Sequence, residues 1–144
     1  MKTLIFIFTT IILLSCGRAK NSAYENKLNT TKKFYPFEKW VQSFSNGLTQ
    51  YTPANCDKAK KIFDDLILDL VAIGEAANEK EKLEQFKKAI LATNKLDEEC
   101  DHTLIETGER EELSELINQI SIASGLHPNK YGNNEGIASE WREW

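Results

Sequence analysis

The apolar residues of this chain recur at intervals of three and four along four separate stretches, and this spacing places them on one face of an α-helix. The first stretch covers 37–51. The second begins at Thr52-Pro53, a capping and first-turn pair, and runs to about residue 77, and the third resumes at Leu83 and ends near Cys100. The fourth opens at Thr107 and ends at Gly125, which fits a left-handed cap. The pattern predicts an all-α fold, a small four-helix array with an irregular C-terminal segment laid across it.

Two cysteines support an antiparallel hairpin of the second and third predicted helices. Asn78 interrupts the apolar pattern between them, and it is also the midpoint of Cys56 and Cys100. At a rise of about 1.5 Å per residue, both thiols therefore lie at the same height, roughly 33 Å from the turn. We expect a disulfide here if the compartment is oxidising, worth roughly 4 kcal/mol through restriction of the unfolded chain. Two unpaired structural thiols are the alternative.

The N-terminal residues follow a different pattern. An apolar run from Leu4 to Leu14 follows a single cation, Lys2. This run is too short to span a bilayer of about 30 Å as a helix, and its layout is that of a secretory signal. Because Leu13-Leu14-Ser15 is followed directly by Cys16, the segment resembles the lipobox of bacterial lipoproteins. An ordinary signal peptide with a chance cysteine is the alternative.

The resemblance to lipoproteins implies that residues 1–15 are a signal peptide and that Cys16 is lipidated. In that family the cysteine thiol takes a diacylglyceryl group, and the new amino group is usually acylated, with palmitate for example. Because each buried methylene contributes about 0.8 kcal/mol, two or three chains hold a domain on a membrane almost permanently. Gly17 follows the cysteine rather than Asp, which favours the outer membrane over the inner one by analogy with enteric bacteria.

Charge separates the segment after Cys16 from the rest of the chain. The whole sequence has a net charge of −4, which makes nucleic acid a poor candidate partner. Residues 16–35 are basic, lack apolar periodicity and are rich in Asn, Ser and Thr. We therefore expect a flexible tether here, followed by a helical domain over 36–144. A basic tether suits anionic lipid headgroups, although a merely solvated linker fits the composition equally well.

The sequence contains few candidates for catalysis or metal binding. The run Glu98-Glu99-Cys100-Asp101-His102 has metal-ligand residue types, but neighbouring positions on a helix point about 100° apart and cannot converge on one ion. Only His102 and His127 are conventional bases near neutral pH, and neither lies in a recognisable motif. The acidic stretch 105–113 lacks the ligand spacing of a calcium loop. The sequence therefore predicts no enzyme, no metal site and no cofactor.

The last four residues combine Trp and Arg, the residue types most enriched at binding hot spots. Trp141, Arg142 and Trp144 are candidate partner-binding residues, and packing of the indoles between helices is the alternative. Together with the stretch 105–113, this end of the chain is similar to small bacterial proteins, some of them toxin-immunity-like.

These features predict a membrane-anchored lipoprotein of the bacterial cell envelope with a non-catalytic protein-binding role. The expected partners are the lipid bilayer, through the acyl chains on Cys16, and an envelope protein. Toxin immunity is the sharpest version of this hypothesis, because an acidic surface speeds association with a basic toxin. The alternatives are a structural spacer in the envelope and a ligand-carrying or hydrolytic envelope protein.

Overall fold

The computed structural model describes residues 22–144, and every regular element in this part of the chain is helical. The α-helices are α2 (Phe37–Ser45), α3 (Pro53–Ile73), α4 (Glu79–Glu99) and α5 (Thr107–Ser124). A helix over residues 22–30 continues into the 3-10 turn η1 (Thr31–Phe34), and three more 3-10 turns, η2 (Pro128–Lys130), η3 (Gly132–Asn134) and η4 (Ile137–Glu140), follow α5. The prediction of an all-α fold with four principal helices is confirmed.

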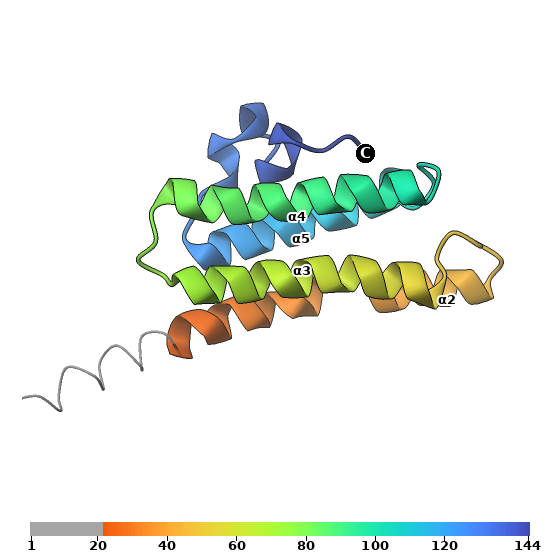
Figure 1. The fold of residues 1–144 in the computed structure, drawn as a ribbon, viewed down its shortest axis with the longest axis horizontal. Helices are drawn as coiled ribbons and strands as arrows, with labels where there is room; N and C mark the ends of the chain where they lie inside the picture. Colours follow the sequence, from red (N-terminus) through yellow and green to blue (C-terminus); the bar gives the residue numbers. More distant parts are fainter. Residues whose placement is uncertain (1–21) are drawn as a thin grey trace, which may run out of the picture.

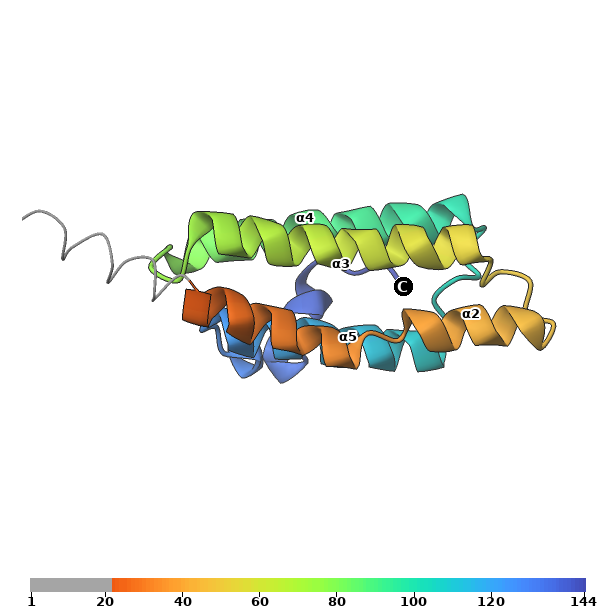
Figure 2. The same ribbon diagram turned by 90° about the horizontal axis from the view of Figure 1, so that it is seen from below.

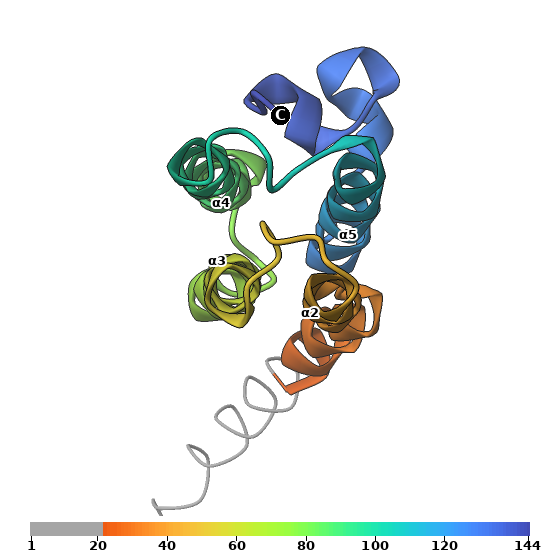
Figure 3. The same ribbon diagram turned by 90° about the vertical axis from the view of Figure 1, so that its right-hand side faces the viewer.

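The helices form an elongated up-and-down bundle (Figure 1). The helix over 22–30, η1 and α2 follow one another along one edge, α3 packs against both α2 and α4, and α5 packs against η1 (Figures 2 and 3). The turn between α3 and α4 lies at the same end of the bundle as residue 22, and we call this the proximal end (Figure 1). The α2–α3 and α4–α5 connections lie at the opposite end, the distal end.

The basic segment after Cys16 is folded from residue 22 onward, so the prediction of a flexible tether is wrong for this part. Tyr24 and Leu28 are both buried in the core. They are four residues apart and therefore share one helical face, while the lysines around them point outward. Two apolar positions are too few to reveal a period in the sequence. Residues 1–21, with the lipobox and Cys16, lie outside the described residues.

The core extends along the whole bundle and is rich in aromatic side chains. The ring of Phe37 lies 5.3 Å from that of Trp40 in an edge arrangement and 5.8 Å from that of Phe63 in a stacked one. Every buried apolar side chain of the described structure lies between Tyr24 and Trp144. Residues 22–144 therefore share one hydrophobic core.

The first predicted helix is shorter than expected. It ends at Ser45 rather than at residue 51, because Gly47 adopts a positive φ of 98° and the N–H of Leu48 turns back to the carbonyl of Ser43. Positive φ is a conformation that glycine adopts at no steric cost. The chain then reverses, and Tyr51 still reaches the core, 5.9 Å from the ring of Trp40.

The hairpin of α3 and α4 has the predicted register. Thr52 caps α3 through a hydrogen bond from the N–H of Asn55 at 3.1 Å, and Asn78 caps α4 in a reciprocal pair with Glu81. Across the hairpin, Lys58 pairs with Glu99 at 3.2 Å and Asp69 with Lys88 at 2.6 Å. The residue numbers of these two pairs add to the same total, and those of Cys56 and Cys100 add to one less. The two cysteines therefore lie at nearly matching heights.

Candidate functional site

The α4–α5 connection at the distal end is organised by the buried carboxylate of Asp97. Its Oδ1 accepts hydrogen bonds from the N–H groups of Leu104 at 3.1 Å and Ile105 at 2.9 Å. Its Oδ2 lies 3.4 Å from Nδ1 of His102. Asp101 and His102 both have positive φ, 56° and 55°, so two consecutive residues adopt the left-handed conformation in this turn. The turn is therefore fixed by side-chain to backbone bonds.

The Glu98–His102 run does not converge on one point. Glu98, Glu99 and His102 are exposed, whereas Asp97, just before the run, is turned inward to the loop backbone. Within residues 22–144 the structure contains no group of three metal-ligand side chains positioned to hold an ion.

The two cysteines of the hairpin are free thiols in the structure, so the expected disulfide is not formed there. Cys56 is 1% exposed, and its Sγ lies 3.6 Å from the carbonyl oxygen of Tyr51. Burial, with smaller contributions from the charges of Asp57 and Cys100, raises the pKa of Cys56 to about 11. Burial and the nearby Asp97 also raise the pKa of Cys100. Neither thiol therefore has the lowered pKa that marks a reactive cysteine.

The distal end exposes apolar side chains beside an acidic helix start. Phe44 at the end of α2 is 39% exposed, and Leu48 in the following loop is 48% exposed. Glu106 and Glu111 at the start of α5 are exposed, and Glu109 is half-exposed. Carboxylates at this position interact favourably with the positive end of the helix dipole. We call the five residues Phe44, Leu48, Glu106, Glu109 and Glu111 the distal surface.

Contacts between α2 and α5 hold the two parts of the distal surface together. Glu112 accepts a hydrogen bond from Nε1 of Trp40 at 2.8 Å and also pairs with Lys39. Burial first, and then the neighbouring carboxylate of Glu109, raises the pKa of Tyr51 above its usual value. Tyr51 therefore lies beside the start of α5, on the side from which the α2–α3 loop projects.

The C-terminal segment fills the opening between α4 and α5 (Figure 3), and η4 contacts both helices. The side chain of Asn94 on α4 binds the segment twice, donating to the carbonyl of Trp141 at 2.8 Å and accepting from the N–H of Glu143 at 3.2 Å. Arg142 reaches Ser114 on α5 at 3.2 Å. Side-chain hydrogen bonds thus attach the segment to both α4 and α5.

The predicted partner-binding residues are brought together by this segment, but they are not equally accessible. Trp144 is only 7% exposed and belongs to the core, so its prediction as a contact residue is corrected. The guanidinium of Arg142 lies 5.9 Å from the ring of Trp144 and 3.4 Å from Glu135. Trp141 is partly exposed. A binding role for Trp141 and Arg142 stays a prediction.

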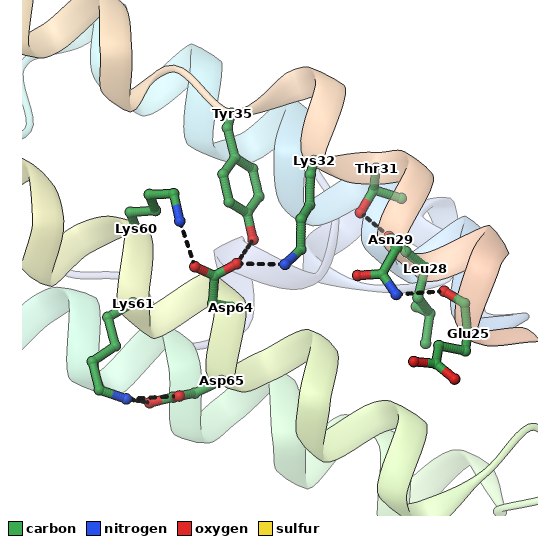
Figure 4. Close-up of polar contacts among 10 residues, drawn as sticks. All are labelled: Glu25, Leu28, Asn29, Thr31, Lys32, Tyr35, Lys60, Lys61, Asp64 and Asp65. Atoms are coloured by element: carbon green, nitrogen blue, oxygen red, sulfur yellow. Dashed lines mark hydrogen bonds and ion pairs between the residues drawn. The ribbon is translucent and has the colours of Figure 1, made fainter.

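A polar cluster around Asp64 fastens the N-terminal segment to α3 (Figure 4). Its two carboxylate oxygens lie 2.7 Å from the ammonium groups of Lys32 and Lys60, and the hydroxyl of Tyr35 donates to Oδ1 at 3.1 Å. Burial alone raises the pKa of Asp64, but the hydrogen bonds from the two lysines outweigh it and hold the pKa below its usual value. The sequence pattern does not reveal this cluster, because Lys32 and Tyr35 belong to the basic stretch 16–35, which lacks apolar periodicity.

The two histidines lie beyond opposite ends of α5. His102 precedes the helix and His127 follows it, so 18 helical residues, about 27 Å, separate them. A surface hollow between α3 and α4 is lined by apolar side chains such as Ile62 and by charged ones such as Asp65 and Lys88. The two described histidines are therefore not paired, and neither lines this hollow.

Comparisons of the chain with known protein families, with curated proteins and with solved structures found no match. Among the described helices, none combines the length and the apolar character that crossing a bilayer requires.

Proposed function

We propose that this chain is an exported lipoprotein, anchored by acyl chains on Cys16, that binds another protein without catalysing a reaction. Residues 13–16 match the lipobox pattern, and Gly17 favours the outer membrane over the inner one. The single observation that supports a binding role best is the arrangement of the two ends. The chain enters the bundle at the proximal end, and the acidic and apolar distal surface lies at the other end.

This arrangement suits a protein held at a membrane by its N-terminus. An anchor at Cys16 keeps the proximal end near the lipid and leaves the distal surface free to meet a partner. The sharpest version of the proposal is toxin immunity, in which the protein captures a basic toxin before it acts. Complementary charge speeds such an encounter.

A disulfide between Cys56 and Cys100 belongs to the same proposal, because exported proteins fold in oxidising compartments. The matching heights of the two residues on α3 and α4 favour it. Oxidation removes two protons and two electrons from the thiols, which a disulfide-exchanging oxidoreductase of the envelope would accept. Mass spectrometry of the exported protein without reductant tests the bridge, and two free thiols would contradict it.

Two other functions compete with binding. A structural spacer would make the distal surface dispensable, and its substitution would leave envelope integrity unchanged. A ligand carrier or hydrolase would need a pocket with suitable groups, and the hollow between α3 and α4 is lined by no histidine, serine, threonine or cysteine. We therefore rank protein binding first.

The experiment begins with the anchor. Cys16→Ala should move the protein from the membrane fraction to the soluble fraction and abolish its labelling by radioactive fatty acid. Unchanged fractionation with no label in the wild type would reject lipid anchoring.

The binding role is tested by crosslinking the wild-type protein in its own envelope and identifying captured proteins by mass spectrometry. A stoichiometric protein partner is expected, and its release by raised salt concentration would fit a charge-assisted complex. A toxin as that partner would establish immunity. Absence of any enriched protein would count against binding and in favour of the spacer.

A further inference from the structure

The end of α2 and the loop after it leave large apolar side chains in water. All residues from Phe44 to Thr49 are exposed, and they include Phe44 at 39% and Leu48 at 48%. Figure 2 shows that this end of α2 and its loop project past the neighbouring helices. Two large apolar groups on one projecting turn lose their contact with water only if another molecule covers them.

The surroundings of this projection are acidic. Exposed or half-exposed carboxylates outnumber cations at the distal end of the described structure, and they belong to these residues: Asp57, Glu98, Glu99, Asp101, Glu106, Glu109 and Glu111. Of the cations there, Lys58 is already paired with Glu99 and Lys39 with Glu112, while Arg110 and Lys95 are exposed. The charged residues before residue 22 are all cations, so the described domain is more acidic than the whole chain at −4.

A second copy of the chain, a lipid surface or another protein could cover an exposed apolar surface, and their charges distinguish them as candidates. A second copy would bring an equally acidic surface against this one, and like charges facing each other oppose association. An anionic lipid surface is disfavoured for the same reason, and the distal end also lies opposite the end where the chain enters the bundle. A cationic protein has the complementary charge.

We propose that the distal surface is a docking site for a cationic protein, with Phe44 and Leu48 as its apolar anchors. This inference rests on the proposed binding function and names the surface and the partner chemistry. The carboxylates of Glu106, Glu109 and Glu111 attract the partner and orient it, which raises the association rate. Phe44 and Leu48 then exclude water at the contact, which slows dissociation.

The test uses the chain from residue 17 onward, which contains every buried apolar side chain of the described structure, and two synthetic probe peptides of equal length and charge. One peptide consists of Lys and Leu and the other of Lys and Ser. Amide chemical shifts of the labelled protein report where each peptide binds. We expect shifts at residues 44–51 and 101–111, tighter binding of the Lys/Leu peptide, and weakening by salt.

Matched variants separate the two parts of the site. Phe44→Ser/Leu48→Ser should weaken binding of the Lys/Leu peptide about tenfold and leave the Lys/Ser peptide nearly unchanged. Leu68→Ser is the apolar control, because Leu68 is 64% exposed on α3 outside the distal surface. Glu106→Gln/Glu111→Gln should weaken binding of both peptides. Its control, Glu75→Gln/Glu84→Gln, removes the same charge from exposed positions near the α3–α4 turn. Circular dichroism confirms that each variant folds.

The docking site would be rejected if neither peptide bound, or if the chemical-shift changes spread over the whole acidic surface. Equal losses of peptide affinity in the variants and their controls would also reject it. So would a dimer in sedimentation experiments that Phe44→Ser abolishes. The experiment contains no membrane, so it does not depend on lipidation of Cys16. If the peptides do not bind the distal surface but an envelope protein is crosslinked to another part of the domain, the docking site is rejected and the proposed binding function is kept.

Discussion

The ammonium group of Lys82, near the start of α4, donates a hydrogen bond to the carbonyl of Ser124 at the end of α5, 2.8 Å away. It also donates to the carbonyl of Glu75 at 2.9 Å, just after α3. One buried cation therefore joins three helices at the proximal end, where the negative ends of α3 and α5 lie.

Replacing Lys82 by Met should test this role. The variant keeps the aliphatic stem but removes the charged donor from two carbonyl groups, so we expect a loss of about 2 kcal/mol in the free energy of unfolding. Urea denaturation provides the measurement. Lys80→Met, at an exposed position of the same helix, should change stability by less than about 0.5 kcal/mol. Equal effects in the two variants would show that the buried hydrogen bonds of Lys82 are unimportant.

Asp97 should be the most sensitive acidic residue at the distal end. Asp97→Ala leaves the buried N–H groups of Leu104 and Ile105 without acceptors, which costs about 3 kcal/mol. Asp101→Asn is the matched control, because Asn tolerates the left-handed conformation that Asp101 adopts. Thermal unfolding and amide hydrogen exchange of residues 101–106 would report the loss. A stable Asp97→Ala variant with a protected loop would contradict the assignment.

The Asp64 cluster predicts a pH-dependent attachment of the N-terminal segment. Because folding lowers the pKa of Asp64 below 3.8, its contribution is complete above that pH and is lost as the pH falls through the lower folded pKa. Asp64→Asn should therefore destabilise the protein by about 1 kcal/mol at pH 7, and the difference from wild type should shrink below about pH 4.

Asp65→Asn provides a control for that experiment, since Asp65 pairs only with Lys61, four residues away on the same helix. It should affect stability less and leave hydrogen exchange of residues 22–34 unchanged. A loss at pH 7 that persists undiminished at pH 3 would show that Asp64 acts through packing rather than charge.

The buried thiol of Cys56 predicts an unusual alkylation profile in the reduced protein. With its pKa at about 11, the reactive thiolate is scarce at pH 7, and the rate of labelling by iodoacetamide should rise about tenfold per pH unit up to that value. Cys100 is less buried and should react first. Peptide mapping after timed quenching distinguishes the two sites. Rapid labelling of Cys56 at neutral pH would contradict the burial seen in the structure.

Helices with many apolar positions were predictable from sequence, and shorter ones were not. α3 and α4 each contain a long periodic face, and the cap signals Thr52-Pro53 and Asn78 locate their starts. The helix over 22–30 contributes only Tyr24 and Leu28 to the core. At the end of α2 the period continued formally to Tyr51, but the Asn46-Gly47 pair was a turn signal that outweighed it.

The candidate site was only partly predictable for the same reason. The pattern assigned Phe44 and Leu48 to a buried face, and only the early end of α2 exposes them. The position of Asp97 is a signal in the sequence. A carboxylate in the last turn of a helix interacts unfavourably with the helix dipole, so its presence there indicates a specific hydrogen-bonding role. Burial of Trp144 depends on the opening between α4 and α5, which no local pattern encodes.

If Cys16 is held in a bilayer, the short stretch between it and the helix over residues 22–30 limits how far the domain can reach from the lipid. Five residues, 17–21, separate the two, and an extended chain of that length reaches about 17 Å. The 21 residues of α3 add about 32 Å. The distal end of α3 is then confined to a layer roughly 50 Å deep above the lipid, whatever the tilt of the bundle, and the projecting end of α2 reaches somewhat further. A soluble partner must enter that layer to be caught, and a membrane-bound one meets the surface by diffusion in two dimensions.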